Sequence, residues 1–220
     1  MNIALLAAAG RAGRTIRNEL ISRGHQVTAV VRNLDKLPKQ LPDTVKCVRD
    51  DLSSVERIAE IITGADAVVS AYGPPSSDPR YTSDTSYTDQ LVSVTERLIA
   101  AVRKASAPRL VVVGGCGSLE FSPGVTVLES GFWPAQYVPI ATSHTKALAA
   151  LRASDINWTY FSPPMSITAG ERTGKFRLGG DSVIKDAAGK SRVSFEDYAV
   201  AVVDELEKPA HERSRFTIGY

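Results

Sequence analysis

Residues 1–15 read MNIALLAAAGRAGRT, and they contain the strongest local indication of the fold class. An apolar run suited to a buried strand leads into Ala7, Gly10 and Gly13, which have the spacing of a G-x-x-G-x-x-G motif with alanine in first place. An amphipathic helical pattern follows and stops at Gly24. A strand, a glycine-rich turn and a helix in this order form either a phosphate-binding loop or a plain turn.

The rest of the chain repeats this alternation of short β-branched runs and helical patterns, which is typical of parallel strands joined by crossover helices. The runs lack a clean apolar–polar alternation, so helices should cover both faces of the sheet. We therefore expect an α/β fold with a doubly wound parallel sheet. The expected strands are 2–8, 26–32, 45–49, 66–71, 109–113 and 157–161.

The connections between the strands contain further local signals. Ser53 and Glu56 have the spacing of a capping box and predict that a helix begins there. An apolar stripe from Leu91 to Val102 predicts a longer helix that packs on the core. The polar, proline-rich stretch 72–86 is expected to be a mobile loop.

The last third of the chain changes character. Residues 170–194 are rich in glycine and charge, and we expect them to form a small C-terminal substrate cap, with a hairpin turn at Asp186–Gly189. A final helix should begin near Ser194. Ligands bind outside the carboxyl ends of parallel strands, so a cap would close over a site from one side, together with residues 118–137.

Composition limits the classes of protein that the chain can represent. Its 220 residues suit one domain, 1–220, and its 26 basic and 24 acidic residues are scattered, so nucleic acid is not an expected partner. No stretch approaches the roughly 18 apolar residues of a membrane span, so no membrane association is expected. The two cysteines lack metal or redox-motif spacing, which predicts no metal site and favours a cytoplasmic protein.

Charged residues at two strand ends indicate how a nucleotide would be held. A protein that selects NAD typically places an acid at the end of the second strand, where this chain has Arg32. Arg32 and Lys36 can both point at one anion, for which a 2′-phosphate is the natural candidate, although either can be an ordinary solvated charge. Asp51, at the end of the third strand, could bind the adenine amino group or cap the next helix.

Several motifs together resemble a known family over nearly the whole chain. They are the glycine-rich loop near the start, VVRN, RDDL, VVSAYG, VVVGGCGSL, SPP, GERTGKFRLGGD, SFEDYAVAVVDELEKP and the terminal RFTIGY. The sequence is similar to the atypical short-chain dehydrogenase/reductase group called NAD(P)H-binding or NmrA-like proteins. That group resembles flavin and biliverdin reductases, which implies a Rossmann domain with a small substrate cap and a strand order of 3-2-1-4-5-6.

The resemblance also implies a set of residues around a bound cofactor, with NADP (NADPH) expected and NAD as the alternative. The implied contacts are Gly10, Arg11, Ala12 and Gly13 with the pyrophosphate; Arg32 and Lys36 with the 2′-phosphate; Asp51 and Leu52 with the adenine; Ala71, Tyr72 and Gly73 with the ribose and pyrophosphate; and Ser118, Ser162 and Pro163 with the nicotinamide. The family usually begins its loop with Gly-Ala-Thr-Gly, whereas Ala7 and Ala9 stand at the first and third of these positions here.

The usual catalytic signature of the wider superfamily is a serine with Tyr-x-x-x-Lys. This chain has Ser118, the candidate catalytic residue, and Lys146, but Thr142 stands where the tyrosine is expected. An aliphatic hydroxyl is a far weaker acid than a phenol, so alcohol–ketone chemistry is disfavoured. Lys146 would hold the ribose or face solvent. His144 could donate a proton, but a solvated surface histidine is the simpler interpretation.

Other side chains leave two interpretations open. Cys116 is a reactive thiol or, as we favour, a small residue in a tight turn. Phe132, Trp133 and Tyr137 could stack on a flat substrate or pack against another subunit of a homodimer; a monomer is equally compatible. Two functions follow: an NAD(P)H-dependent reductase of a planar small-molecule acceptor such as a flavin or quinone, or a non-catalytic, NADP-binding redox sensor.

Overall fold

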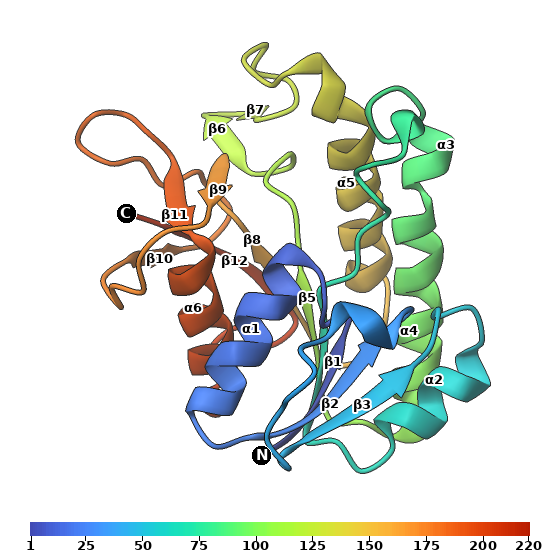
Figure 1. Cartoon of the computed structure of the whole chain (residues 1–220). Helices are drawn as coiled ribbons and strands as arrows, with labels where there is room; N and C mark the ends of the chain where they lie inside the picture. Colours follow the sequence, from blue (N-terminus) through green and yellow to red (C-terminus); the bar gives the residue numbers. More distant parts are fainter.

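The computed structural model describes residues 1–220 and contains one eight-stranded sheet with helices on both faces (Figure 1). The strand order is β10-β12-β8-β5-β4-β1-β2-β3. The strands are β1 (Asn2–Leu6), β2 (Gln26–Val31), β3 (Val45–Arg49), β4 (Ala67–Ser70), β5 (Leu110–Val113), β8 (Trp158–Ser162), β10 (Arg177–Gly179) and β12 (Ser214–Gly219). Two small sheets pair β6 (Glu120–Ser122) with β7 (Val125–Thr126) and β9 (Ser166–Thr168) with β11 (Arg192–Ser194).

The predicted topology is confirmed. The six strands expected from the sequence are β1 to β5 and β8, and they pair in parallel in the order 3-2-1-4-5-6. The register places Leu5 of β1 between Ala29 and Val69 of its neighbours. The α/β, Rossmann-like doubly wound fold is therefore as predicted. Two further strands were not expected from the sequence: β12, which extends the sheet in parallel, and β10, which adds an antiparallel edge.

The helices divide between the two faces of the sheet. The main helices are α1 (Arg11–Ser22), α2 (Val55–Ile62), α4 (Gln90–Ala105), α5 (Val138–Arg152) and α6 (Phe195–Glu207). Helices α1 and α6 cover one face, and α2, α4 and α5 cover the other (Figure 1). No helix is both long and apolar enough to cross a membrane.

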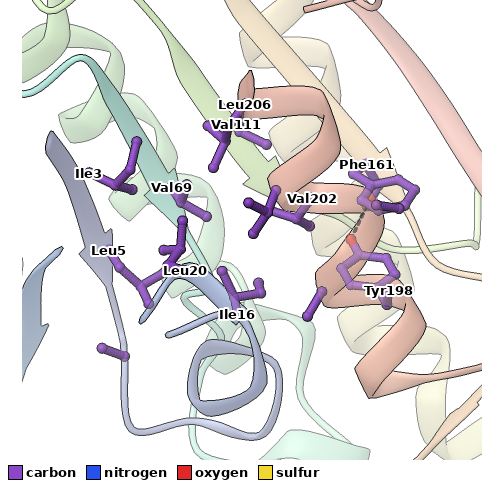
Figure 2. Close-up of a cluster of buried hydrophobic side chains, with 14 of the residues drawn as sticks. Ile3, Leu5, Ile16, Leu20, Val69, Val111, Phe161, Tyr198, Val202 and Leu206 are labelled. Atoms are coloured by element: carbon purple, nitrogen blue, oxygen red, sulfur yellow. Dashed lines mark hydrogen bonds between the residues drawn. The ribbon is translucent and has the colours of Figure 1, made fainter. Parts of the chain in front are cut away.

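Each face of the sheet has its own hydrophobic core. The core beneath α1 and α6 holds α1 against the sheet (Figure 2). Ile16 and Leu20 of α1 are fully buried against β1. The rings of Phe161 and Tyr198 stack with their centroids 4.1 Å apart, and the Tyr198 hydroxyl donates to the Phe161 carbonyl. Burial of a side chain such as Ile16 or Leu20 contributes about 1.5–3 kcal/mol to the stability of the fold, so these two residues anchor α1 on the sheet.

The helix after β3 begins one residue later than predicted, because Ser54 rather than Ser53 is its N-cap. The Ser54 hydroxyl accepts from the Arg57 N–H at 3.3 Å. The carboxylate of Asp51 instead accepts from the Ser53 N–H, which closes a local turn before the helix. The predicted capping box at Ser53 and the helix cap at Asp51 were both wrong.

The stretch 72–86 is more structured than a plain loop. It contains the 3₁₀ turn η2 (Pro79–Thr82) and leads into the short helix α3 (Thr85–Thr88). Asp78 caps η2 and forms an ion pair with Arg80, whose guanidinium lies 4.4 Å from the ring centre of Tyr87. These local polar contacts give the stretch a defined path that the proline-rich composition did not predict.

The predicted cap at 170–194 is only partly separate from the sheet. Strand β10 belongs to the main sheet, while β11 pairs in parallel with β9. The turn at Asp186–Gly189 forms, since the Gly189 N–H donates to the Asp186 carbonyl, but the strands beside it pair elsewhere, so the predicted hairpin was wrong. Because β6 follows β5 and β9 follows β8, both small sheets lie beyond the carboxyl ends of the main strands (Figure 1).

Candidate functional site

The turn between β1 and α1 has the geometry that its glycines predicted. Gly10 is the N-cap of α1 in an extended conformation, and its N–H donates to the Ala7 carbonyl at 3.0 Å. A Cβ atom on Gly13 would lie 2.3 Å from the same carbonyl oxygen. Gly13 therefore allows α1 to start directly against the end of β1, which aims the first turn of the helix at the carboxyl edge of the sheet (Figure 1).

Ala7 holds a backbone conformation that favours glycine, with φ at +60°. A Cβ atom in this left-handed region is strained by about 1–2 kcal/mol. The sequence motif had already marked Ala7 as the position of the first glycine, and the structure supplies the physical reason for glycine there.

We expect Ala7→Gly to stabilise the fold by about 1 kcal/mol, because it removes the strain but adds freedom to the unfolded chain. The strain is present without a ligand, so most of the gain should appear in unfolding and only a smaller part in NADPH affinity. Urea unfolding gives the first quantity and calorimetric titration the second. An unfolding midpoint at or below that of the native chain would contradict the argument.

The first turn of α1 is unusually positive. No side chain caps this turn, and no acidic residue lies in it. Arg11 and Arg14 are exposed there, and neither forms an ion pair with a carboxylate. The helix macrodipole already places partial positive charge at this end, so two arginines add repulsion unless an anion is near. The arrangement suits a phosphate group at the free N–H groups of the turn.

A cavity of about 430 Å³ opens beside this turn, at the carboxyl ends of β1 to β4. Most of the predicted nucleotide contacts line it, while Arg11, Ala12 and Gly13 lie on the helix side of the turn. The lining residues are Ala7, Ala9, Gly10, Val30, Val31, Arg32, Asn33, Lys36, Asp50, Asp51, Leu52, Ala71, Tyr72 and Gly73.

The cationic side of the cavity is formed by Arg32 and Lys36. Both are exposed, and neither forms an ion pair with a carboxylate of the chain. Asn33 between them caps the 3₁₀ turn η1 (Leu34–Lys36), which fixes the path of the backbone that carries both cations. Two free positive charges at the end of β2 are suited to one strongly negative group.

Another part of the cavity lining is held by hydrogen bonds around Leu52. Its N–H donates to Asp50 at 2.7 Å, and its carbonyl accepts from Arg97 Nε at 2.7 Å. Tyr72 also lines the cavity, and burial raises the pKa of its hydroxyl despite the nearby Arg32 and Arg97. Leu52 and Tyr72 were expected here from the sequence, whereas Asp50 and Asn33 were not. Asp50 directly follows β3, so its strand-end position was an available signal.

The residues present fit a dinucleotide. A Cβ on Gly10 would meet only the Ala7 carbonyl, at 3.4 Å, and a Cβ on Gly73 would meet nothing within 4 Å. The backbone at both positions is therefore open to the cavity, as a close approach to phosphate or ribose requires. The phosphates of a nucleotide need hydrogen-bond donors, which the free N–H groups and the unpaired cations supply. The glycines leave the backbone accessible to them.

Comparison with known proteins agrees with this geometry. A family model described as NAD(P)H-binding matches residues 7–209. The chain belongs to this NAD(P)H-binding family. The predicted membership of an NAD(P)H-binding group is thereby confirmed, and the family match covers the turn, the cavity and both small sheets.

Relatives of this NAD(P)H-binding chain align over almost their whole length. The uncharacterized protein YwnB of Bacillus subtilis is 38% identical over 99% of this chain and 98% of its own. A crystal structure from Bacteroides thetaiotaomicron, described as a "putative epimerase", has a TM-score of 0.89 at 38% identity, covering 100% of this chain and 96% of that one. A "putative NADH-flavin reductase" from Streptococcus pneumoniae has a TM-score of 0.85 at 31% identity, covering 100% and 99%.

The predicted nicotinamide-side residues lie outside the cavity. The Ser118 hydroxyl accepts from Arg215 Nη1 at 2.8 Å, and Lys146 Nζ donates to Asp89 at 2.6 Å. Ser162 ends β8 fully buried, with no hydrogen-bond partner for its hydroxyl, and Pro163 follows it. The contacts of Ser118, Ser162 and Pro163 with nicotinamide, and of Lys146 with ribose, stay predictions.

His144 is packed rather than solvated, so the expectation of a surface histidine was wrong. It lies against Gly115, where a Cβ would be 2.7 Å from its ring, and its Nδ1 is 3.2 Å from the Tyr160 hydroxyl. Burial lowers the pKa of His144 to about 4, so the ring is neutral near pH 7 and a poor proton donor. No group of three or more His, Cys, Asp or Glu side chains gathers as a metal-binding set.

Cys116 is a buried packing residue with Leu119 and Val127, and burial raises the pKa of its thiol to about 12. Cys47 is exposed on β3. Because the thiolate is the reactive form, we expect iodoacetamide at pH 8 to label Cys47 alone in the folded protein and both cysteines in urea. Mass spectrometry of the labelled peptides reads this out. Rapid labelling of Cys116 in the folded chain would restore the reactive-thiol interpretation.

The three aromatic residues lie near one another in the segment before α5. Phe132 is 73% exposed and its ring centre lies 5.5 Å from that of Phe121. The Trp133 and Tyr137 ring centres are 6.2 Å apart. Phe132 and Tyr137 are exposed, whereas Trp133 is partly buried against the cluster of Cys116, Leu119 and Val127, and both predicted uses, substrate stacking and subunit contact, stay open.

Proposed function

We propose that the chain is an NADPH-dependent reductase of a planar acceptor such as a flavin or a quinone. The observation that carries this is the pair Arg32 and Lys36, which face the cavity without a carboxylate partner. An acid at the end of β2 would hold the ribose 2′-hydroxyl of NADH, whereas two cations suit the 2′-phosphate of NADPH. The name of the Streptococcus pneumoniae relative supports a reductase and a flavin acceptor.

In this proposal each side of the cavity has a separate task. Gly10 and the free N–H groups of α1 bind the pyrophosphate, with Arg11 adding charge. Arg32 and Lys36 bind the 2′-phosphate. The loop around Leu52 borders the adenine. Bound NADPH supplies the hydride, and the protein supplies orientation and electrostatics.

The choice of acceptor rests on the lack of a competent proton donor. Thr142 replaces the usual tyrosine, Lys146 is paired with Asp89, and Ser118 is held by Arg215. A flavin or quinone can take its proton from solvent after hydride transfer, so it needs no tyrosine. The same observation favours a second candidate, a non-catalytic sensor that binds NADP and signals its occupancy to a partner.

Turnover separates the two candidates. The purified chain is mixed with NADPH and a panel of FMN, FAD and quinones, and the loss of NADPH absorbance is followed. Consumption of NADPH supports the reductase, while tight binding without consumption supports the sensor. A chain that binds neither NADPH nor NADH would contradict both.

The two free cysteines suit a cytoplasmic protein, which we propose acts as a monomer or homodimer.

A further inference from the structure

Arg17 is a buried cation without an acidic partner. It lies one turn after Gly13 in α1 and is 2% exposed. Its Nη1 donates to the Ala8 carbonyl at 3.2 Å and its Nη2 to the Asn18 side chain at 3.2 Å, whereas its Nε has no partner. Two other arginines with buried side chains, Arg109 and Arg215, are paired with the carboxylates of Glu205 and Asp181.

A buried charge of this kind destabilises a protein that has no ligand. Removing a guanidinium from water is unfavourable unless an opposite charge compensates it, and Arg17 has only two neutral acceptors. Burial accordingly lowers the pKa of Arg17. The stability of the ligand-free fold therefore does not explain why a cation occupies this position.

The position of Arg17 connects it to the nucleotide site. Ala8, whose carbonyl it holds, lies within the turn between the strained Ala7 and the N-cap Gly10. The exposed cations around this turn, Arg11 and Arg14 on α1 and Arg32 and Lys36 on the cavity wall, also lack carboxylate partners. Five cations without a carboxylate partner thus gather around one turn, while the two carboxylates of the cavity lining, Asp50 and Asp51, accept hydrogen bonds from the N–H groups of Leu52 and Ser53.

We propose that Arg17 is a positioning residue of the dinucleotide site, whose buried charge is compensated by the phosphates of bound NAD(P)H. It holds the Ala8 carbonyl beneath the turn, so that the backbone N–H groups face the ligand. Being buried, its charge is screened by salt much less than the charges of the exposed arginines. This inference rests on nucleotide binding at the cavity but not on turnover of any acceptor.

The test compares Arg17→Met, which removes the charge, with Arg17→Lys, a matched variant that keeps it. Calorimetry measures the NADPH affinity, and thermal unfolding is followed with and without saturating NADPH. We expect Arg17→Met to weaken NADPH binding about tenfold and Arg17→Lys by no more than about threefold. Without ligand, the melting temperature of Arg17→Met should equal or exceed that of Arg17→Lys. With NADPH, the order should reverse.

The difference in melting temperature between Arg17→Met and Arg17→Lys should change sign when NADPH is added, and this change distinguishes a positioning role from a purely structural one. If Arg17 served packing alone, both variants would lose stability and neither would change the stabilisation by NADPH, which would overturn the proposal. An Arg17→Met chain that does not fold would overturn it too, since the charge would then be needed without ligand. Native protein that binds NADPH but reduces no acceptor would refute the reductase and leave this inference standing.

Discussion

The Gly10→Val chain should fold normally and fail to bind NADPH. Gly10 is extended, with φ −67° and ψ 173°, a conformation open to valine. Its Cβ position meets only the Ala7 carbonyl, at 3.4 Å, so the fold has room for the side chain. The branched side chain would then stand in the cavity where the pyrophosphate must approach the backbone.

We expect at least about a 100-fold loss of NADPH affinity, equivalent to about 2.7 kcal/mol. Loss of a glycine N-cap should lower the free energy of unfolding by no more than about 1 kcal/mol. The matched control is Gly180→Val, because a Cβ at Gly180 meets nothing within 4 Å and Gly180 lies outside the cavity. If Gly10→Val binds NADPH as the native chain does, the stretch that opens the sequence is only a turn.

The correct predictions share a local origin. The strand, the turn with Ala7, Gly10 and Gly13, and the helix form one continuous stretch, so their spacing alone dictates their geometry. Arg32 and Lys36, which are four positions apart and joined by one 3₁₀ turn, line the cavity for the same reason, and their contact with a 2′-phosphate stays a prediction. Because parallel strands end at one edge, side chains at the ends of neighbouring strands meet in one cavity without any knowledge of tertiary contacts.

The features that the sequence did not predict depend on partners far away in the chain. Lys146 pairs with Asp89 across 57 positions, and Ser118 with Arg215 across 97, so no local pattern could show that these side chains are engaged. The hairpin at Asp186–Gly189 failed for the same reason, since β11 finds its partner in β9 rather than across the turn. Arg17 was overlooked because a helical arginine normally faces solvent, and its burial is visible only in the folded chain.

Arg32→Asp should reverse the cofactor preference. In the native chain the guanidinium of Arg32, unpaired and beside Lys36, is available to the 2′-phosphate of NADPH. A hydrogen bond to a charged group contributes about 1.5–3 kcal/mol, so its loss should weaken NADPH binding roughly 10- to 100-fold. The new carboxylate repels the 2′-phosphate but can accept from the ribose 2′-hydroxyl of NADH, whose affinity should be kept or improved.

The measurement is a pair of calorimetric titrations, NADPH and NADH, on the native chain and on Arg32→Asp. Lys46→Asp makes the same change of charge on β3 outside the cavity, and it should leave the NADPH/NADH ratio as it is. A lowered NADPH affinity in both variants would mean that only the overall field of the protein matters. Equal affinities of the native chain for the two cofactors would show that Arg32 and Lys36 are solvated charges and that NADPH selection has no basis at the end of β2.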